Sequence, residues 1–164
     1  MSDRYDNLNH NTLLASVGSM SRRWKEAIFV APPHNIEDYF TLEAPDALVL
    51  ADEMGAALTQ VTILTNAIRT TSYLEPDPLP DMYAEAMRNE LSGDRPKSAT
   101  EGLEQIIAIN DEVYGRLQDL RLVDWKNTAT GDSGTVSISD LVKGVSRVNA
   151  ERLARATRTL HAVL

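Results

Sequence analysis

Hydrophobic residues recur at helical spacing in four long stretches of the chain. In the first stretch, Leu13, Val17, Met20 and Trp24 follow one another at intervals of four, three and four residues. Residues at these intervals share one face of an α-helix, so each stretch predicts a helix with a buried stripe. Alternation every second residue, which is typical of half-buried strands, is nearly absent. We therefore expect long helices near residues 10–29, 46–71, 98–121 and 138–162.

The predicted helix starts carry capping signals. Ser98 followed by Glu101 forms the pattern of a capping box, and the run from Ser137 to Asp140 is a second start of this kind. Pro45 is placed as a first-turn proline of the second helix. The proline-rich link at residues 75–80 leads to a short predicted helix near residues 80–91, and a polar loop is expected at residues 126–134.

These elements predict an all-α fold. Residues 1–164 form one expected domain, a four-helix bundle with helices running up and down. A long crossover connection in its middle contains the short extra helix. The length is sufficient for one hydrophobic core without disulfides or metal staples.

Composition narrows the classes of partner. The chain has 16 Lys and Arg against 24 Asp and Glu, a formal net charge of -8, which argues against nucleic-acid and anionic-membrane surfaces. It contains no cysteine, so disulfides and thiol nucleophiles are excluded. No apolar run reaches the eighteen or so residues of a membrane span, and the start lacks a signal-peptide pattern. We expect a cytoplasmic protein.

Arg152 is the most informative single residue. It continues the stripe of Leu141, Val145 and Val148 on the last helix. A guanidinium stays charged at any working pH, so an inward-facing one needs a carboxylate or carbonyl partner. The alternative is that Arg152 lies at the edge of the stripe and extends its charged end to water.

A candidate pocket follows from this position. An acidic side chain of the second helix is the expected partner, Glu53 before Asp52, because Glu53 lies on the shoulder of that helix's apolar stripe. Asn110, which interrupts the stripe of the third long helix, is expected either to hydrogen-bond in this polar region or to face the end of the bundle. The candidate pocket comprises Asp52, Glu53, Asn110, Val148 and Arg152.

The chain resembles the DinB-like superfamily. The resemblance rests on the order and spacing of Trp24 in the first helix, Asp124-Trp125 before the last loop, and the run from Val136 to Val142 (VSISDLV) entering the last helix. It implies a helical bundle that often binds a divalent metal through three histidines, includes thiol-dependent transferases and isomerases, and frequently forms homodimers. The matching last-helix ligand positions are Val148 and Arg152, and the second-helix position falls near Asp52 or Glu53. The resemblance therefore implies the fold but a degenerate metal site.

No other ligand set is visible. His10 in the N-terminal arm, His34 in a Pro-Pro-His loop and His161 near the end of the chain are not expected to converge. The adjacent pairs Asp52-Glu53 and Asp111-Glu112 diverge by about 100° on a helix, so neither presents two carboxylates to one point. No phosphate-binding glycine loop or nucleophile motif occurs. No cofactor is expected, with a divalent metal kept as the alternative.

Three functions remain open. The first is a non-catalytic DinB-like bundle that acts by binding a small molecule or a partner, with Arg152 in place of the metal. The second is an enzyme with thiol-transfer or hydrolase-type chemistry that uses a non-standard metal site, or Arg152 to orient an anion. The third is an adaptor whose acidic surface docks a basic partner. The last helix is the most basic part of the chain, so a small anionic ligand is a candidate for it. Its cations are Lys143, Arg147, Arg152, Arg155 and Arg158.

Overall fold

The computed structural model describes residues 4–5, 8–29, 36–43, 45–46, 48–70, 77–88 and 90–163. This part of the chain is mostly helical, with five α-helices, two 3-10 helices and one two-stranded antiparallel sheet. The all-α class is therefore confirmed. In chain order the elements are α1 (His10–Phe29), η1 (Ile36–Tyr39), α2 (Leu50–Arg69), α3 (Leu79–Ala86), α4 (Ala99–Asp119), η2 (Leu122–Lys126), β1 (Thr128–Gly131), β2 (Gly134–Ser137) and α5 (Ile138–Val163).

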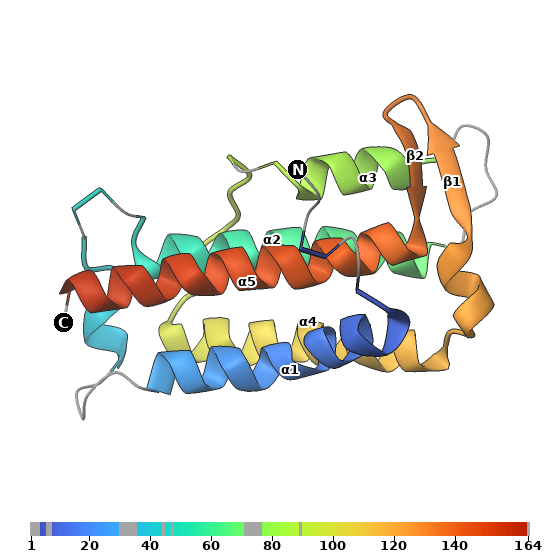
Figure 1. Cartoon of the computed structure of the whole chain (residues 1–164). Helices are drawn as coiled ribbons and strands as arrows, with labels where there is room; N and C mark the ends of the chain where they lie inside the picture. The colour runs from blue at the N-terminus through green and yellow to red at the C-terminus, as the bar shows by residue number, and fades with distance from the viewer. Residues whose placement is uncertain are drawn as a thin grey trace.

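The four long helices, α1, α2, α4 and α5, lie side by side along one direction (Figure 1). Helices α1 and α4 pack together, α2 packs on both α4 and α5, and α1 also packs on α5. The short helix α3 contacts α2 and the β-hairpin, and Figure 1 shows it beside the hairpin, outside the four long helices. The predicted short helix thus exists and lies outside the packed long helices.

The long helices do not simply alternate in direction. Met54 near the start of α2 lies beside Gly102 near the start of α4, and Arg69 at the end of α2 pairs with Glu112 late in α4. Helices α2 and α4 therefore run in the same direction, and the prediction of an up-and-down order is wrong. The reason is the long connection that carries α3, which returns the chain to the end from which α2 started.

The hydrophobic core has two buried clusters along the long helices. One contains Val17, Leu64, Val113 and Val145 and extends to the hairpin and Trp125. The other contains Trp24, Met54, Ile106 and Leu160, near the opposite end. Complete burial of each large aliphatic side chain contributes about 1.5–3 kcal/mol. The stripes predicted from the sequence supply both clusters.

Both predicted helix starts have a serine N-cap, but only the one at Ser137 has the two reciprocal hydrogen bonds of a capping box. Ser98 Oγ accepts a hydrogen bond from the amide of Glu101 at 3.1 Å. Ser137 Oγ accepts one from the amide of Asp140 at 3.0 Å, and Asp140 Oδ2 accepts one from the amide of Ser137 at 2.8 Å. Each bond satisfies an amide that the first helical turn leaves without a carbonyl.

The start of α2 differs from the prediction. The helix begins at Leu50 instead of residue 46, and Pro45 is not in its first turn. Asp46 has φ 56°, a left-handed backbone conformation that cannot belong to a right-handed helix. The preceding residue Val49 provides no side-chain cap. The first turn of α2 is thus left without the side-chain acceptor that usually covers its amides.

The hairpin formed by β1 and β2 was not predicted, since a polar loop was expected over most of it. Ala129 and Val136 face each other in register, and both are buried. Gly131 lies so close to the link that a methyl group there would be 2.7 Å from the carbonyl oxygen of Asp77. The strands are four residues each, too short for a clear two-residue alternation.

Helix α3 is shorter than predicted and ends at Ala86 rather than near residue 91. Side chains of α2 and α5 hold the carbonyl groups that follow it, as described below. Within the described residues, no helix combines the length and the apolar character needed to cross a membrane.

Candidate functional site

Arg152 is buried and held by three groups from two other segments. Its Nη1 donates to Glu53 Oε2 at 3.1 Å, its Nε donates to Gln60 Oε1 at 2.7 Å, and its Nη2 donates to the carbonyl oxygen of Leu91 at 3.1 Å. The Arg152 residue is 3% exposed. The predicted pairing of Arg152 with Glu53 is confirmed, and the alternative of a solvated arginine is wrong.

Gln60 extends this contact to the end of α3. It lies seven residues after Glu53 on the same face of α2. Its Nε2 donates to the carbonyl oxygen of Ala86 at 2.9 Å and to that of Arg88 at 3.4 Å. Carbonyls at the end of a helix lack intrahelical partners, and here Gln60 and Arg152 supply side-chain donors. The contact therefore fastens the crossover segment to α2 and α5.

Asn110 belongs to a different buried polar group. Asn149 Nδ2 donates to Asn110 Oδ1 at 2.8 Å, and Asn110 Nδ2 donates to Asn149 Oδ1 at 3.2 Å. Trp24 Nε1 also donates to Asn149 Oδ1, at 3.0 Å. Across the described residues no hydrogen bond joins Asn110 to Arg152. The group links α1, α4 and α5, and it gives the fully buried indole N–H of Trp24 a hydrogen-bond acceptor.

The other two residues of the candidate pocket lie elsewhere. Asp52 receives a two-pronged hydrogen bond from Arg95, with distances of 2.6 and 3.0 Å, and this bond raises the pKa of Arg95. Val148 is buried in the hydrophobic core. The structure thus brings Glu53 and Arg152 together, while Asp52 and Asn110 bind other partners and Val148 lies one helical turn before Arg152, packed in the core.

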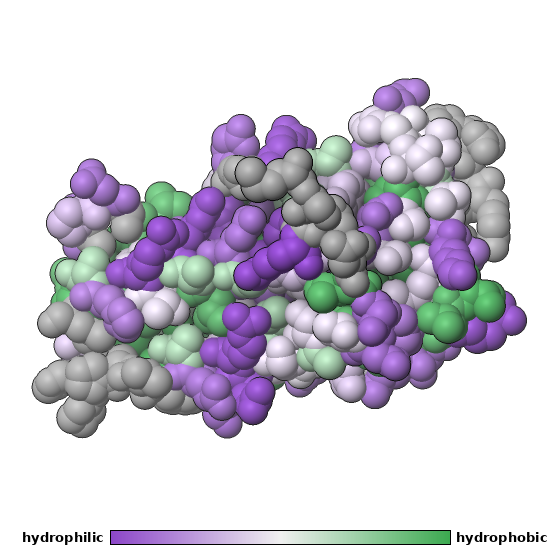
Figure 2. Space-filling view, in the orientation of Figure 1, coloured by the Kyte–Doolittle hydropathy of each residue, from purple (hydrophilic) through white to green (hydrophobic). Residues whose placement is uncertain are grey.

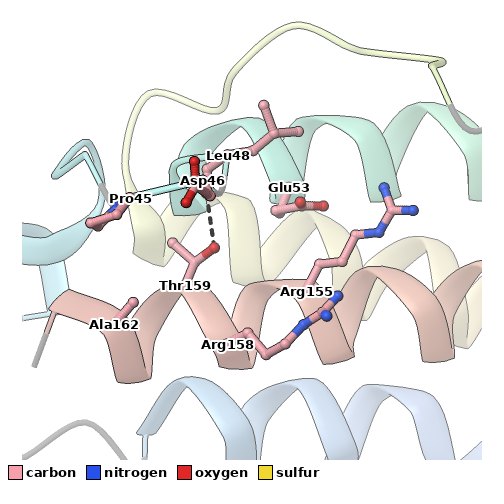
Figure 3. Close-up of a pocket in the computed structure, with 8 residues that line it drawn as sticks. All are labelled: Pro45, Asp46, Leu48, Glu53, Arg155, Arg158, Thr159 and Ala162. Carbon is pink, nitrogen blue, oxygen red and sulfur yellow. Dashed lines mark hydrogen bonds between the residues drawn. The ribbon is translucent and has the colours of Figure 1, made fainter.

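A cleft opens next to Glu53, between the start of α2 and the last turns of α5 (Figure 3). Its volume is about 520 Å³, within the range of small-molecule sites. We refer to it as the α2–α5 cleft. Its lining residues are Pro45, Asp46, Leu48, Glu53, Arg155, Arg158, Thr159 and Ala162.

Two cations of α5 face this cleft. Arg155 is half-buried and extends from α5 toward α2, while Arg158 is exposed (Figure 3). Within the described ranges, neither guanidinium has an ion pair or hydrogen bond to a protein group. Glu151, one turn before Arg155, is not within ion-pair distance of it. Both arginines lie in the C-terminal half of α5 but before its last turn, so the helix dipole contributes little to their placement.

The opposite wall of the cleft carries acceptors. Asp46 and Glu53 come from the segment that enters α2 and from its first turn (Figure 3). Thr159 Oγ1 donates its hydrogen to the carbonyl oxygen of Leu48 at 2.8 Å, so the same oxygen can only accept from a ligand. This bond also ties α5 to the entry of α2 and fixes the width of the cleft at that point.

The surface around these elements is polar. In Figure 2, hydrophilic residues cover much of the visible face along α5. Exposed hydrophobic side chains occur near η2, where Leu122 and Val123 are 58% and 61% exposed, and also at the cleft, where the lining residue Leu48 is 50% exposed. The cleft thus combines charged and apolar surface.

The histidines do not form a ligand set in the described part of the chain. His10 is the first residue of α1 rather than part of an N-terminal arm, and its ring meets Trp125 edge-on at 4.0 Å. His161 lies in the last turn of α5, at the other end of the molecule. His34 falls outside the described residues. Among the residues that are described, no group of three or more His, Cys, Asp or Glu is arranged to hold a metal ion.

Comparison with known proteins found no counterpart. No family model, curated protein or solved structure matches the chain.

Sequence reasoning missed Gln60 and Asn149, although signals for both exist. Gln60 shares a helix face with Glu53, and Asn149 lies four residues after Val145 on the inner side of α5. The α2–α5 cleft had no such signal, because its two walls meet through tertiary packing and the left-handed turn at Asp46.

Proposed function

We propose that the chain is a four-helix bundle with a crossover connection, related to the DinB-like proteins. In this proposal the ion pair of Arg152 and Glu53 takes the place of the metal that the family often binds. The order of four long helices, with a short helix in the connection between α2 and α4, supports this proposal. Val148 has no ligand atom, and the guanidinium of Arg152 is cationic and committed to Glu53, Gln60 and Leu91.

The proposed activity is the binding of a small anionic molecule in the α2–α5 cleft. The observation that carries this proposal is that Arg155 and Arg158 line a cleft of about 520 Å³ without a protein anion paired to either, in the part of the chain described. A guanidinium presents a fork of donors that fits carboxylate and phosphate oxygens. Two such forks at one concave site favour an anion with at least two oxygens.

The buried pair next to the cleft supports the same function. Arg152 compensates the charge of Glu53, so this carboxylate does not cancel the positive charge of Arg155 and Arg158. The cleft therefore presents excess positive charge, although the chain as a whole is acidic.

Isothermal titration calorimetry at low salt tests this proposal by measuring the binding of succinate and of inorganic phosphate to the purified full chain. At least one of the two should bind, and affinity should fall with rising ionic strength. The variant Arg155→Ala with Arg158→Ala should lose binding about tenfold or more, since hydrogen bonds to charged groups are strong when desolvated.

The matched control is Arg22→Ala, which removes one exposed arginine from α1, outside the cleft. It should bind the probes like the unchanged protein. Equal weakening by Arg22→Ala would mean that the probes sense only overall charge, and absence of binding to the unchanged protein would reject the anion site.

A further inference from the structure

We propose that the ligand of the α2–α5 cleft is amphoteric: a small molecule that carries a carboxylate or phosphate at one end and an amine at the other. This inference rests on the proposed anion site and adds the chemistry of the second end. Its basis is that the two walls of the cleft have opposite charge, with Arg155 and Arg158 on α5 and the exposed carboxylate of Asp46 on the side of α2, where Glu53 adds an acceptor oxygen whose charge Arg152 compensates (Figure 3).

The two walls do not neutralise each other. Within the described part of the chain, neither Asp46 nor Glu53 forms an ion pair with Arg155 or Arg158. Glu53 uses Oε2 to accept from Arg152, and its other oxygen has no hydrogen-bond donor among the described residues. Opposite charges that face one cavity without pairing leave both signs available to a ligand that spans it.

Asp46 is held at the rim by its backbone. Its φ of 56° lies in the left-handed region, which a non-glycine residue adopts at some cost, and asparagine and aspartate tolerate it best. The residue directs an exposed carboxylate to the opening of the cleft. Asparagine can replace it in the same conformation, so Asp46→Asn removes the charge without altering the turn.

Thr159, on α5, adds an acceptor at the point where α5 meets the segment that enters α2. Because its hydroxyl hydrogen is committed to the carbonyl oxygen of Leu48, its oxygen offers lone pairs and no donor to the cleft. A purely anionic ligand has no donor to place there. An ammonium group has three donors and can meet Asp46, Glu53 and Thr159.

The experiment compares probes that differ only in the amine. 4-Aminobutyrate is titrated against butyrate, and 6-aminohexanoate against hexanoate, with butylamine as the amine alone, by calorimetry on the full chain. For at least one of the two lengths, the amino acid should bind about tenfold more tightly than the matched acid, which is the value of one charge-assisted contact. Asp46→Asn should reduce this preference and leave the binding of the plain acid unchanged. Asp119→Asn, an exposed change at the end of α4, serves as the control.

The outcomes separate this inference from the proposed function. Equal binding of the amino acids and the plain acids at both lengths, or an undiminished preference in Asp46→Asn, overturns the amphoteric ligand but leaves the anion site intact. Absence of binding of every acid, with or without the amine, together with no binding of succinate or phosphate, overturns both. Binding of butylamine alone with the same affinity as 4-aminobutyrate would show that the arginines play no part.

Discussion

Arg152 on α5 meets Glu53 on α2 across the interior, with Nη1 3.1 Å from Oε2 and both side chains 4% exposed. The pair joins two antiparallel helices, near the start of α2 and the middle of α5. Removing both charges from water is costly, and the further hydrogen bonds to Gln60 and to the carbonyl oxygen of Leu91 help to offset that cost for the guanidinium.

Replacing Arg152 with alanine should lower the unfolding free energy on the order of 3–5 kcal/mol, because Glu53 would be left as a buried carboxylate without its cation. The double variant Arg152→Met with Glu53→Gln should recover much of this loss, since neither charge remains. Urea denaturation of the two single variants and the double variant measures the coupling. Coupling indistinguishable from zero would contradict a stabilising role for the pair. Arg95→Ala, which breaks the exposed pair with Asp52, should cost far less.

Asn149 should matter more to stability than Asn110. Asn149→Ala leaves both the Trp24 indole and the Asn110 amide without their shared partner, at a cost of about 2–4 kcal/mol. Asn110→Ala leaves the Trp24 bond in place and should cost about 1–3 kcal/mol. Thermal unfolding of both variants gives the order, and tryptophan fluorescence should change mainly in Asn149→Ala. The reverse order would show that the hydrogen bond of Trp24 contributes little.

The stability contributed by Glu37 should depend on pH. Burial raises the pKa of Glu37, but hydrogen bonds from the backbone amides of Thr100 and Ala99 and from the Thr100 hydroxyl outweigh it, so the pKa is lowered. A carboxyl with a lowered pKa takes up protons more readily in the unfolded chain. Its contribution is therefore full above the unfolded pKa of about 4.3 and is lost as the pH falls through the lower folded value.

Glu37→Gln should accordingly be less stable than the unchanged protein at pH 7, by about 0.5–1 kcal/mol because solvent screens a partly exposed group. The difference should shrink as the pH falls below the unfolded pKa of about 4.3 and through the lower pKa of the folded state. Denaturation curves between pH 7 and pH 3 test this. A difference that stays constant over the range would mean that the charge of Glu37 does not stabilise the start of α4.

Two glycines in helices should respond to alanine in opposite ways. A methyl group on Gly55 would lie 2.7 Å from the carbonyl oxygen of Asp94, so Gly55→Ala should push the crossover segment from α2 and destabilise the fold by about 1–3 kcal/mol. A methyl group on Gly115 in α4 would meet open space, so Gly115→Ala should stabilise the fold by about 0.5–1 kcal/mol. Differential scanning calorimetry distinguishes the two, and a stabilising Gly55→Ala would contradict the close packing.

A chelator should leave the stability of the untagged, purified protein unchanged, because under the proposed DinB-like relationship Val148 and Arg152 would occupy the two positions of the paired metal ligands, and neither side chain can bind a metal cation. Thermal unfolding with and without EDTA measures this. A fall of several degrees that zinc or nickel reverses would favour the alternative of an enzyme with a non-standard, carboxylate-based metal site.

The sequence alone determined the long helices and several of their contacts. The stripes predicted α1, α4 and α5 closely, the N-caps at Ser98 and Ser137 set two helix starts, and helix geometry selected Glu53 over Asp52 as the partner of Arg152. These features depend on neighbours within one or two turns, or on which face of a helix must be buried. Both are properties of local spacing and side-chain polarity.

The tertiary structure alone decided the remaining features. Asn149 joins Asn110 and Trp24, Gln60 reaches the end of α3, and Arg155 and Arg158 face Asp46 across a cleft. The late start of α2 depends on a left-handed residue, and the hairpin depends on the burial of Ala129 and Val136. The side-chain contacts and the cleft require segments far apart in the chain to meet at a defined direction and register, and the turn and the hairpin are fixed by what packs against them. Local spacing does not specify these, because they follow from how the helices pack and where the crossover returns.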